Sequence, residues 1–190
     1  MEMNDPGRER GIARIALLAG LVAALGVLPP IALPFGVPIT AQTMGVMLAG
    51  AILGARGGFL ALLLFLALVA MGLPLLAGGH GGLAVLAGPT AGFLVGWPFG
   101  ALVTGALVRR LRLRRTALRV ALASVIGGIA VIYAFGIVGM SLSLGRPVAE
   151  CALLVMAFVP GDLVKAAVTG LVVATLERAR PDTLPALRGR

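Results

Sequence analysis

The chain has 190 residues, of which 59% are hydrophobic and only 12% are charged. A soluble domain carries about a quarter charged residues, so the composition excludes an ordinary soluble protein and indicates an integral membrane protein. The formal net charge of +9 does not indicate nucleic-acid binding, because the arginines stand in short blocks between apolar segments, as topology signals do. The single cysteine, Cys151, excludes an internal disulfide.

Six apolar segments follow one another along the chain and predict an all-α membrane protein. A spanning helix needs about 20 mostly apolar residues. We expect a single membrane domain, 1–190, with spans at residues 12–28, 42–53, 57–71, 91–108, 117–140 and 151–176, two of which are short.

The distribution of basic residues predicts the orientation of these spans. With the N-terminus in the cytoplasm, fourteen of the sixteen Lys and Arg residues fall on the cytoplasmic side. Arg146 falls on the outer side, and Lys165 lies within a span. This bias predicts six helices with both termini in the cytoplasm. We expect a multi-pass protein of the bacterial inner (cell) membrane.

Two connections on the predicted outer side are unusual. "PIALPFGVPIT" (30–40) is rich in proline, and "GLPLLAGGHGGLAVLAGPT" (72–90) is rich in glycine and too apolar to extend into water. Non-helical backbone at membrane depth is tolerated where it is buried in protein or lines a cavity. We therefore expect structured extracytoplasmic loops that cap a binding pocket.

Asp162 and Lys165 interrupt the last apolar segment, within "VPGDLVKAAV". Charged side chains inside a membrane are costly and mark functional sites by default. Residues three apart share a helix face, so both can point into the bundle. The pair is either a structural ion pair or a ligand site for a group with adjacent N–H and C=O. A zwitterion, or an acid held by Lys165 alone, also fits. Pro160 and Gly161 predict a break here, with Asp162 as a helix N-cap.

Other polar residues stand beside the two loops. His80, the single histidine, is either a solvated loop residue or a ligand contact. Gln42 and Thr43 open the second span, and Thr90 precedes the fourth. Each of these three either caps a helix and hydrogen-bonds between helices or contacts a ligand.

The aromatic residues Trp97, Phe93, Phe35 and Tyr133 are expected to lie in the interface belt or to pack, as is usual in membrane proteins.

The first span carries small residues at four-residue spacing, namely Ala16, Ala19, Gly20, Ala23 and Ala24. Such faces let helices approach closely, either within the chain or against another membrane subunit.

Motifs for chemistry are absent from the sequence. It contains no ATP-binding loop, no HExxH motif and no second histidine to build a metal site or a Ser–His–Asp triad. We therefore expect no enzyme activity, no metal and no cofactor.

Three segments resemble, in order and spacing, the biotin-specific substrate-binding (S) components of energy-coupling-factor (ECF) transporters, the BioY family. They are "PFGVPITAQTMGVMLAGAILGARGG", "GLPLLAGGHGGLAVLAGPTAGFLVGWPFGA" and "VPGDLVKA". The resemblance implies high-affinity capture and uptake of biotin, together with a transmembrane coupling protein and two ATP-binding subunits.

The resemblance also implies roles for the residues singled out above. Asp162 would accept from the ureido N–H of biotin and Lys165 would donate to its carbonyl, or Lys165 would instead bind the carboxylate. The loop with His80 would close over the ligand, and the small residues of the first span would face the coupling protein.

Other functions remain open at this point. The chain could be an S component for another vitamin, or a stand-alone proton-coupled carrier that uses Asp162 or Lys165 as a relay. It could also be a membrane scaffold in which the pair is only structural.

Overall fold

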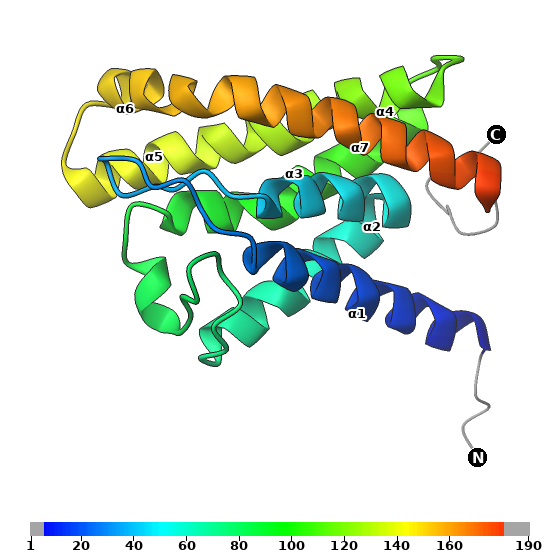
Figure 1. Ribbon diagram of the computed structural model, residues 1–190, viewed down its shortest axis with the longest axis horizontal. Coiled ribbons are helices and arrows are strands. Elements are labelled where there is room, and N and C mark those ends of the chain that lie inside the picture. Colours follow the sequence, from blue (N-terminus) through cyan, green and yellow to red (C-terminus); the bar gives the residue numbers. More distant parts are fainter. Residues whose placement is uncertain (1–5, 181–190) are drawn as a thin grey trace.

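The computed structural model describes residues 6–180 as an all-helical bundle (Figure 1). The elements in chain order are α1 (Pro6–Gly26), α2 (Gln42–Ala70), the 3₁₀ turn η1 (Leu83–Leu86), α3 (Ala91–Arg110), α4 (Thr116–Ser124), the π-helical segment η2 (Val125–Val131), α5 (Ile132–Leu144), α6 (Val148–Val155), the 3₁₀ turn η3 (Met156–Phe158) and α7 (Val159–Ala179). Within this part of the chain, β-pairing is limited to two isolated bridges. The predicted all-α class is confirmed.

Four helical stretches of residues 6–180 are long and apolar enough to cross a membrane. They are Gln42–Ala70, Ala91–Arg110, Thr116–Leu144 and Val148–Ala179. The third joins α4, η2 and α5 without a loop, and the fourth joins α6, η3 and α7.

A sharp kink divides α2 into two arms. Gly54 has φ +79° and ψ −178°, a conformation that only glycine adopts readily. The arms diverge at this point in Figure 1, and an added Cβ on Gly58 would lie 2.8 Å from the Cα of Gly50, so they pack closely beside the kink. A Cβ at Gly105 of α3 would collide with Gly54 and Ala55. The kink therefore rests directly on α3.

The helix boundaries differ from those predicted. α1 begins at Pro6 and ends at Gly26, because the charged residues before Ile12 favour helix as well as the apolar ones do. The spans expected at 42–53 and 57–71 form one kinked helix with no loop between them, and it ends at Ala70.

The last three predicted spans are longer in the structure than in the prediction. α3 continues through Arg110, and α5 continues to Leu144, where Gly145 adopts the left-handed conformation that commonly ends helices. The final helical stretch runs from Val148 to Ala179. Hydropathy marks the apolar middle of a helix but not the polar turns at its ends.

The two ends of the bundle differ in character. At the left-hand end of Figure 1 lie the connections 27–41 and 71–90 and the turn between α5 and α6; we call it the loop end. At the right-hand end lie the first turns of α1 and the connection 111–115, which carries three arginines; we call it the basic end.

We predict that Gly54→Ala destabilises the protein by about 1–3 kcal/mol, because alanine must adopt a strained backbone conformation at the kink. Gly20→Ala is the matched control, since Gly20 lies in an exposed helical turn where an added Cβ meets nothing within 4 Å. Thermal unfolding in detergent, followed by the fluorescence of the single tryptophan, measures both. Equal unfolding midpoints for the two variants would contradict this account of the kink.

Candidate functional site: a cavity beneath two loops

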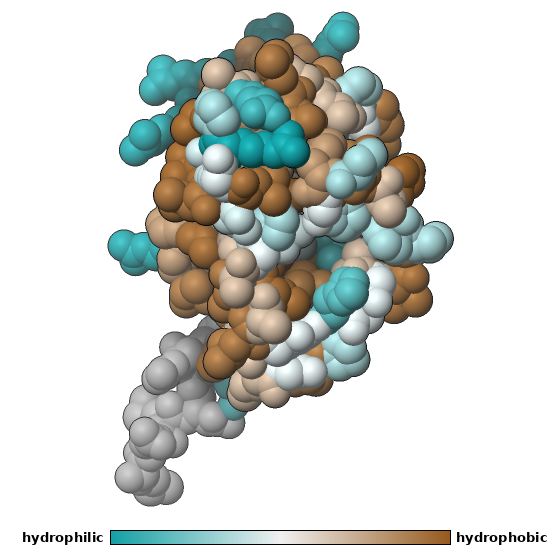
Figure 2. Space-filling view, turned by 90° about the vertical axis from the view of Figure 1, so that its left-hand side faces the viewer, coloured by the Kyte–Doolittle hydropathy of each residue, from teal (hydrophilic) through white to brown (hydrophobic). Residues whose placement is uncertain are grey.

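A cavity of about 470 Å³ opens at the loop end of the bundle. Both unusual loops line it, the first with residues between Pro30 and Thr40 and the second with residues between Leu76 and Gly88. The helices α2, α3, α5 and α7 supply the rest of the wall. Figure 2 looks onto this end and shows the hollow, with hydrophilic atoms inside a rim of mixed hydropathy.

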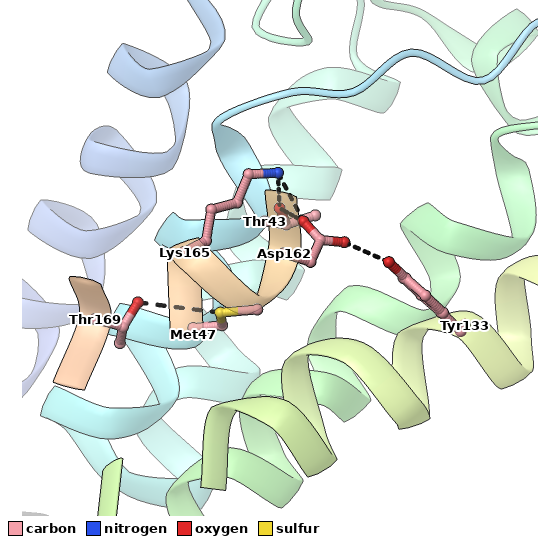
Figure 3. Close-up of polar contacts among 6 residues, drawn as sticks. All are labelled: Thr43, Met47, Tyr133, Asp162, Lys165 and Thr169. Atoms are coloured by element: carbon pink, nitrogen blue, oxygen red, sulfur yellow. Dashed lines mark hydrogen bonds and ion pairs between the residues drawn. The ribbon is translucent and has the colours of Figure 1, made fainter. Parts of the chain in front are cut away.

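Four polar side chains meet in the cavity wall (Figure 3). Lys165 Nζ donates to Asp162 Oδ1 at 2.7 Å and to Thr43 Oγ1 at 3.0 Å. Thr43 Oγ1 in turn lies 3.3 Å from Asp162 Oδ1 and donates to it. The hydroxyl of Tyr133 donates to Asp162 Oδ2 at 2.8 Å. Both carboxylate oxygens are therefore hydrogen-bonded, and we call these four residues the polar cluster.

The polar cluster is built on a close contact between α2 and α7. Thr43 and Met47 lie one helical turn apart on α2, as Lys165 and Thr169 do on α7. Thr43 contacts Lys165, and one turn further on the hydroxyl of Thr169 lies 4.0 Å from the sulfur of Met47 (Figure 3). The two helices thus face each other with matching turns, and α5 adds Tyr133 from the side.

The helix break next to the polar cluster lies earlier than predicted. The last helical stretch is interrupted by η3 at Met156–Phe158, and α7 begins at Val159, before Pro160. Proline is tolerated in the first turn of a helix, so Pro160 does not break it. Asp162 is therefore not the N-cap that we predicted. It lies in the first turn of α7, where a negative charge is favourable.

Burial makes the pairing in the polar cluster necessary. Asp162 is 3% exposed, and the side chain of Lys165 is 16% exposed. An isolated charge at such a position would cost several kcal/mol, which the partner charge and the two hydroxyls offset. Because Lys165 donates two hydrogen bonds, to Asp162 and Thr43, and an ammonium has three N–H groups, one donor remains for a ligand.

Aromatic rings surround the polar cluster. Phe93 and Phe158 line the cavity with Tyr133, and each pair of these three rings makes an edge contact with centroids 6.0–6.5 Å apart. Phe35, on the first loop, stacks edge-on against Phe158 at 5.8 Å. Trp97 also lines the cavity. The packing role expected for these aromatics is thus accurate, although they pack around a cavity.

Tyr133 is the functional candidate that we missed from the sequence. We assigned it to packing or the interface belt, whereas its hydroxyl binds the buried carboxylate of Asp162. A single tyrosine in an otherwise apolar span was the available signal, because a buried phenol needs a hydrogen-bond partner.

Gln42 is a structural clamp. Its Nε2 donates to the carbonyls of Val22 at 3.1 Å and Leu75 at 3.0 Å, and its Oε1 accepts from the backbone N–H of Ala77 at 3.0 Å. The amide thereby joins α1, α2 and the second loop beside the cavity. Its side chain makes no capping hydrogen bond with α2, so the capping part of the prediction was wrong, whereas the expected hydrogen bonding between helices is confirmed by the bond to Val22 of α1.

The remaining predicted site residues lie at the cavity without a direct contact to the polar cluster. His80 is exposed and lines the cavity, on a tight turn in which the N–H of Leu76 donates to the carbonyl of His80 at 3.0 Å. Thr90 is half-buried, lines the cavity and immediately precedes α3, without a side-chain cap.

The small residues of α1 divide between two faces of the helix. Ala19 is buried and Ala23 is half-buried, so both face the interior of the bundle. Ala16, Gly20 and Ala24 are exposed and form a second face. A docking role is therefore open only to these last three within this fold.

A family model for the BioY family matches residues 3–182. The chain belongs to the BioY family. It is 51% identical over 185 residues to the biotin transporter BioY of Rhodobacter capsulatus, an alignment that covers 93% of this chain and 97% of that protein. It is 52% identical over 169 residues to the biotin transporter BioY of Rhizobium etli, covering 86% of this chain and 90% of that protein.

The fold of this BioY family member matches a solved structure as well. The crystal structure of the S-component for biotin from an ECF-type ABC transporter superposes with a TM-score of 0.85 at 29% sequence identity. The match covers 93% of this chain and 95% of the other. The resemblance noted in the sequence is thereby confirmed at the level of both family and fold.

We predict that Gln42→Leu lowers the free energy of unfolding by about 1–3 kcal/mol, because the buried N–H of Ala77 loses its acceptor. Thr90→Val is the matched control at the cavity, since the side chain of Thr90 makes no capping hydrogen bond with α3, and its effect should stay within about 0.5 kcal/mol. Thermal unfolding in detergent measures both variants. If Gln42→Leu were as stable as the control, the hydrogen bonds of Gln42 would contribute nothing to the free energy of unfolding.

Proposed function

We propose that this chain is the substrate-binding component for biotin in an ECF-type transporter. The observation that carries the proposal is the polar cluster within an aromatic cavity, in a chain whose relatives are named biotin transporters. The relatives and the matched structure are transport proteins, which confirms the prediction that the chain is not an enzyme. Their names also favour biotin over another vitamin, and biotin is the transported ligand of this chain, with no cofactor indicated.

The ligand orientation follows from the charge of the polar cluster. The ammonium of Lys165 is already balanced by the carboxylate of Asp162 at 2.7 Å. A neutral ureido group suits such a neutral pair, because its N–H groups can donate to Asp162 while its carbonyl accepts the remaining N–H of Lys165. A ligand carboxylate would instead compete with Asp162 for Lys165. We therefore place the ureido ring at the polar cluster and the carboxylate toward the opening, where water solvates it.

The aromatic wall suits the remainder of the ligand. The fused thioether ring and the aliphatic chain of biotin are apolar and would lie against Phe93, Phe158 and Trp97. Ligand pockets commonly combine such a wall with a few placed polar groups. His80, on the exposed turn of the second loop, would lie near the mouth, where it can contact the outer part of the ligand.

We infer six membrane crossings in one domain, with both termini in the cytoplasm. The four long apolar stretches account for four of them, the kink at Gly54 allows α2 to cross as two arms, and α1 supplies the remaining one. The basic end carries the arginines of 109–115 and of α1, as the positive-inside rule requires of a cytoplasmic side. The loops at the other end are then extracytoplasmic and cap the cavity. We propose localisation to a bacterial inner membrane, which the bacterial relatives support.

The partners are ECF subunits: in our proposal, a transmembrane coupling protein and two ATP-binding subunits. The absence of an ATP-binding loop from the sequence supports a division of labour in which other chains supply energy. The exposed face of Ala16, Gly20 and Ala24 supports close helix packing against the coupling protein.

Equilibrium binding of labelled biotin to the purified protein tests the function. Lipoic acid, which has a similar acid chain and sulfur but no ureido group, should not compete. Saturable sub-micromolar binding of biotin without such competition is the expected result. Its absence, or equal competition by lipoic acid, would contradict the proposal.

We predict that Asp162→Asn and Lys165→Met each weaken biotin binding by about 2–5 kcal/mol, because each variant leaves the other buried charge of the pair without its counter-ion. Tyr133→Phe, which removes one hydrogen bond to the carboxylate, should weaken binding less. Wild-type affinity in both charge variants would remove the pair from the binding site.

Biotin methyl ester distinguishes the two orientations. If the ureido ring occupies the polar cluster, Lys165→Met should weaken the binding of biotin and of its methyl ester by the same factor. A penalty that disappears with the ester would instead show that Lys165 binds the carboxylate.

We predict that Gly20→Leu reduces co-purification of the coupling protein while biotin binding is retained. An added Cβ at Gly20 meets nothing within 4 Å, so the larger side chain disturbs only what docks from outside. Ala134→Leu, an enlargement at an exposed position of α5, is the control and should co-purify like the wild type. Equal co-purification of the two variants would contradict docking on this face.

A further inference from the structure

A second cavity, of about 380 Å³, lies at the basic end, between the first turns of α1 and the kink of α2. Its lining residues are Gly7, Arg10, Gly11, Arg14 and Ile15 from α1, with Leu53 and Gly57 from α2. Arg10 and Arg14 are four residues apart, so they lie on one helix face and border the same space. We call this space the arginine cavity.

Positive charge gathers at the arginine cavity without a balancing carboxylate among residues 6–180. The two ion pairs found in this range are Arg146–Glu150 and Lys165–Asp162, so neither Arg10 nor Arg14 is paired with a described acid. Among the residues that the structure describes, no acid lines the cavity. Guanidinium groups bind phosphate through paired, charge-assisted hydrogen bonds, so a concave site with two of them favours a phosphate-type anion.

The surface beside the arginine cavity is apolar and exposed. Ile12 and Leu17 of α1 are 59% and 69% exposed, and Leu60 of α2, three residues after Gly57, is 48% exposed. In a membrane such side chains face acyl chains. A ligand that binds here therefore combines an anionic phosphate with apolar chains, which is the chemistry of a phospholipid.

We propose that the arginine cavity binds the phosphodiester headgroup of an anionic phospholipid, with Arg10 and Arg14 donating to its oxygens and the acyl chains lying along α1 and α2. The proposal rests on the membrane orientation inferred above but not on the identity of the transported ligand. About eleven residues of α2, or roughly 16 Å of helix, separate Thr43 in the polar cluster from the kink. The lipid site is therefore distinct from the vitamin site.

Gly11 keeps the arginine cavity open. A Cβ at this position meets nothing within 4 Å, so a larger side chain fits without disturbing the fold. Gly11→Leu therefore fills the cavity and preserves both arginines, which separates the shape of the site from its charge.

Native mass spectrometry of the purified full chain tests the proposal, with phosphatidylglycerol and phosphatidylcholine of identical acyl chains as probes. Phosphatidylglycerol should bind more tightly than phosphatidylcholine. Arg10→Gln and Arg14→Gln should each weaken it by about fivefold, the effect of one basic residue at a membrane surface. Gly11→Leu should also weaken it, and Gly11→Ala should do so less.

The matched controls are the single variants Arg109→Gln and Arg110→Gln. Each removes one positive charge, as each test variant does, from an exposed position at the basic end that does not line the cavity. Phosphatidylglycerol affinity should remain near wild type in both controls. An equal loss in both pairs of variants would show general surface attraction and overturn the proposal.

Three further results would overturn the proposal. The two lipids could bind equally well, or millimolar inorganic phosphate could displace phosphatidylglycerol, which would make free phosphate the ligand. The arginine variants could also keep lipid affinity but lose the coupling protein on co-purification, which would make the cavity a protein-docking site. Biotin binding is measured separately, so failure of the lipid site and failure of the transport function are distinguishable.

Discussion

The buried ion pair of Asp162 and Lys165 is the constraint on which the cavity end of this protein depends. Two charges within an apolar bundle are tolerated only with a complete set of partners, and Thr43 and Tyr133 supply them from two other helices. The pair therefore fixes the turns of α2, α5 and α7 that face one another. A ligand that binds to the polar cluster would therefore contact residues of all three helices.

Around this pair, the loops are held in place by backbone hydrogen bonds and aromatic contacts. Gln42 joins the second loop to α1 and α2, and Phe35 brings the first loop onto Phe158. The cavity is thus covered by these two loops, which have little regular secondary structure.

The basic end follows a different physical rule from the loop end. There, glycines at the α2 kink and on α3 allow backbone to approach backbone, and arginines gather outside this tight contact. The arginines of 109–115 are exposed at this end and Arg119 is buried, whereas at the loop end the charges of Asp162 and Lys165 are buried and paired. The proposed vitamin site and the proposed lipid site therefore lie at opposite ends of the molecule.

Much of the site could be read from the sequence because charge is so unfavourable inside a membrane. Asp162 and Lys165 stand out in an apolar segment, and their three-residue spacing placed them on one face. Thr43, His80 and Thr90 were found by their position beside the loops, and all three line the cavity. The apolar segments likewise indicated the helical class. The predicted helix ends were inaccurate, because hydropathy does not detect the polar turns at which helices end.

Other features required the tertiary structure. Tyr133 is 29 residues from Asp162 in sequence, and no local pattern indicates that its hydroxyl reaches that carboxylate. The amide of Gln42 binds backbone groups 20 to 35 residues away, which only the folded loops bring together. The division of the small residues of α1 into an inner and an outer face was also decided by packing. Sequence alone determined which groups must be buried and paired, because that depends on solvation; the tertiary structure decided which partners meet, because that depends on contacts between distant segments.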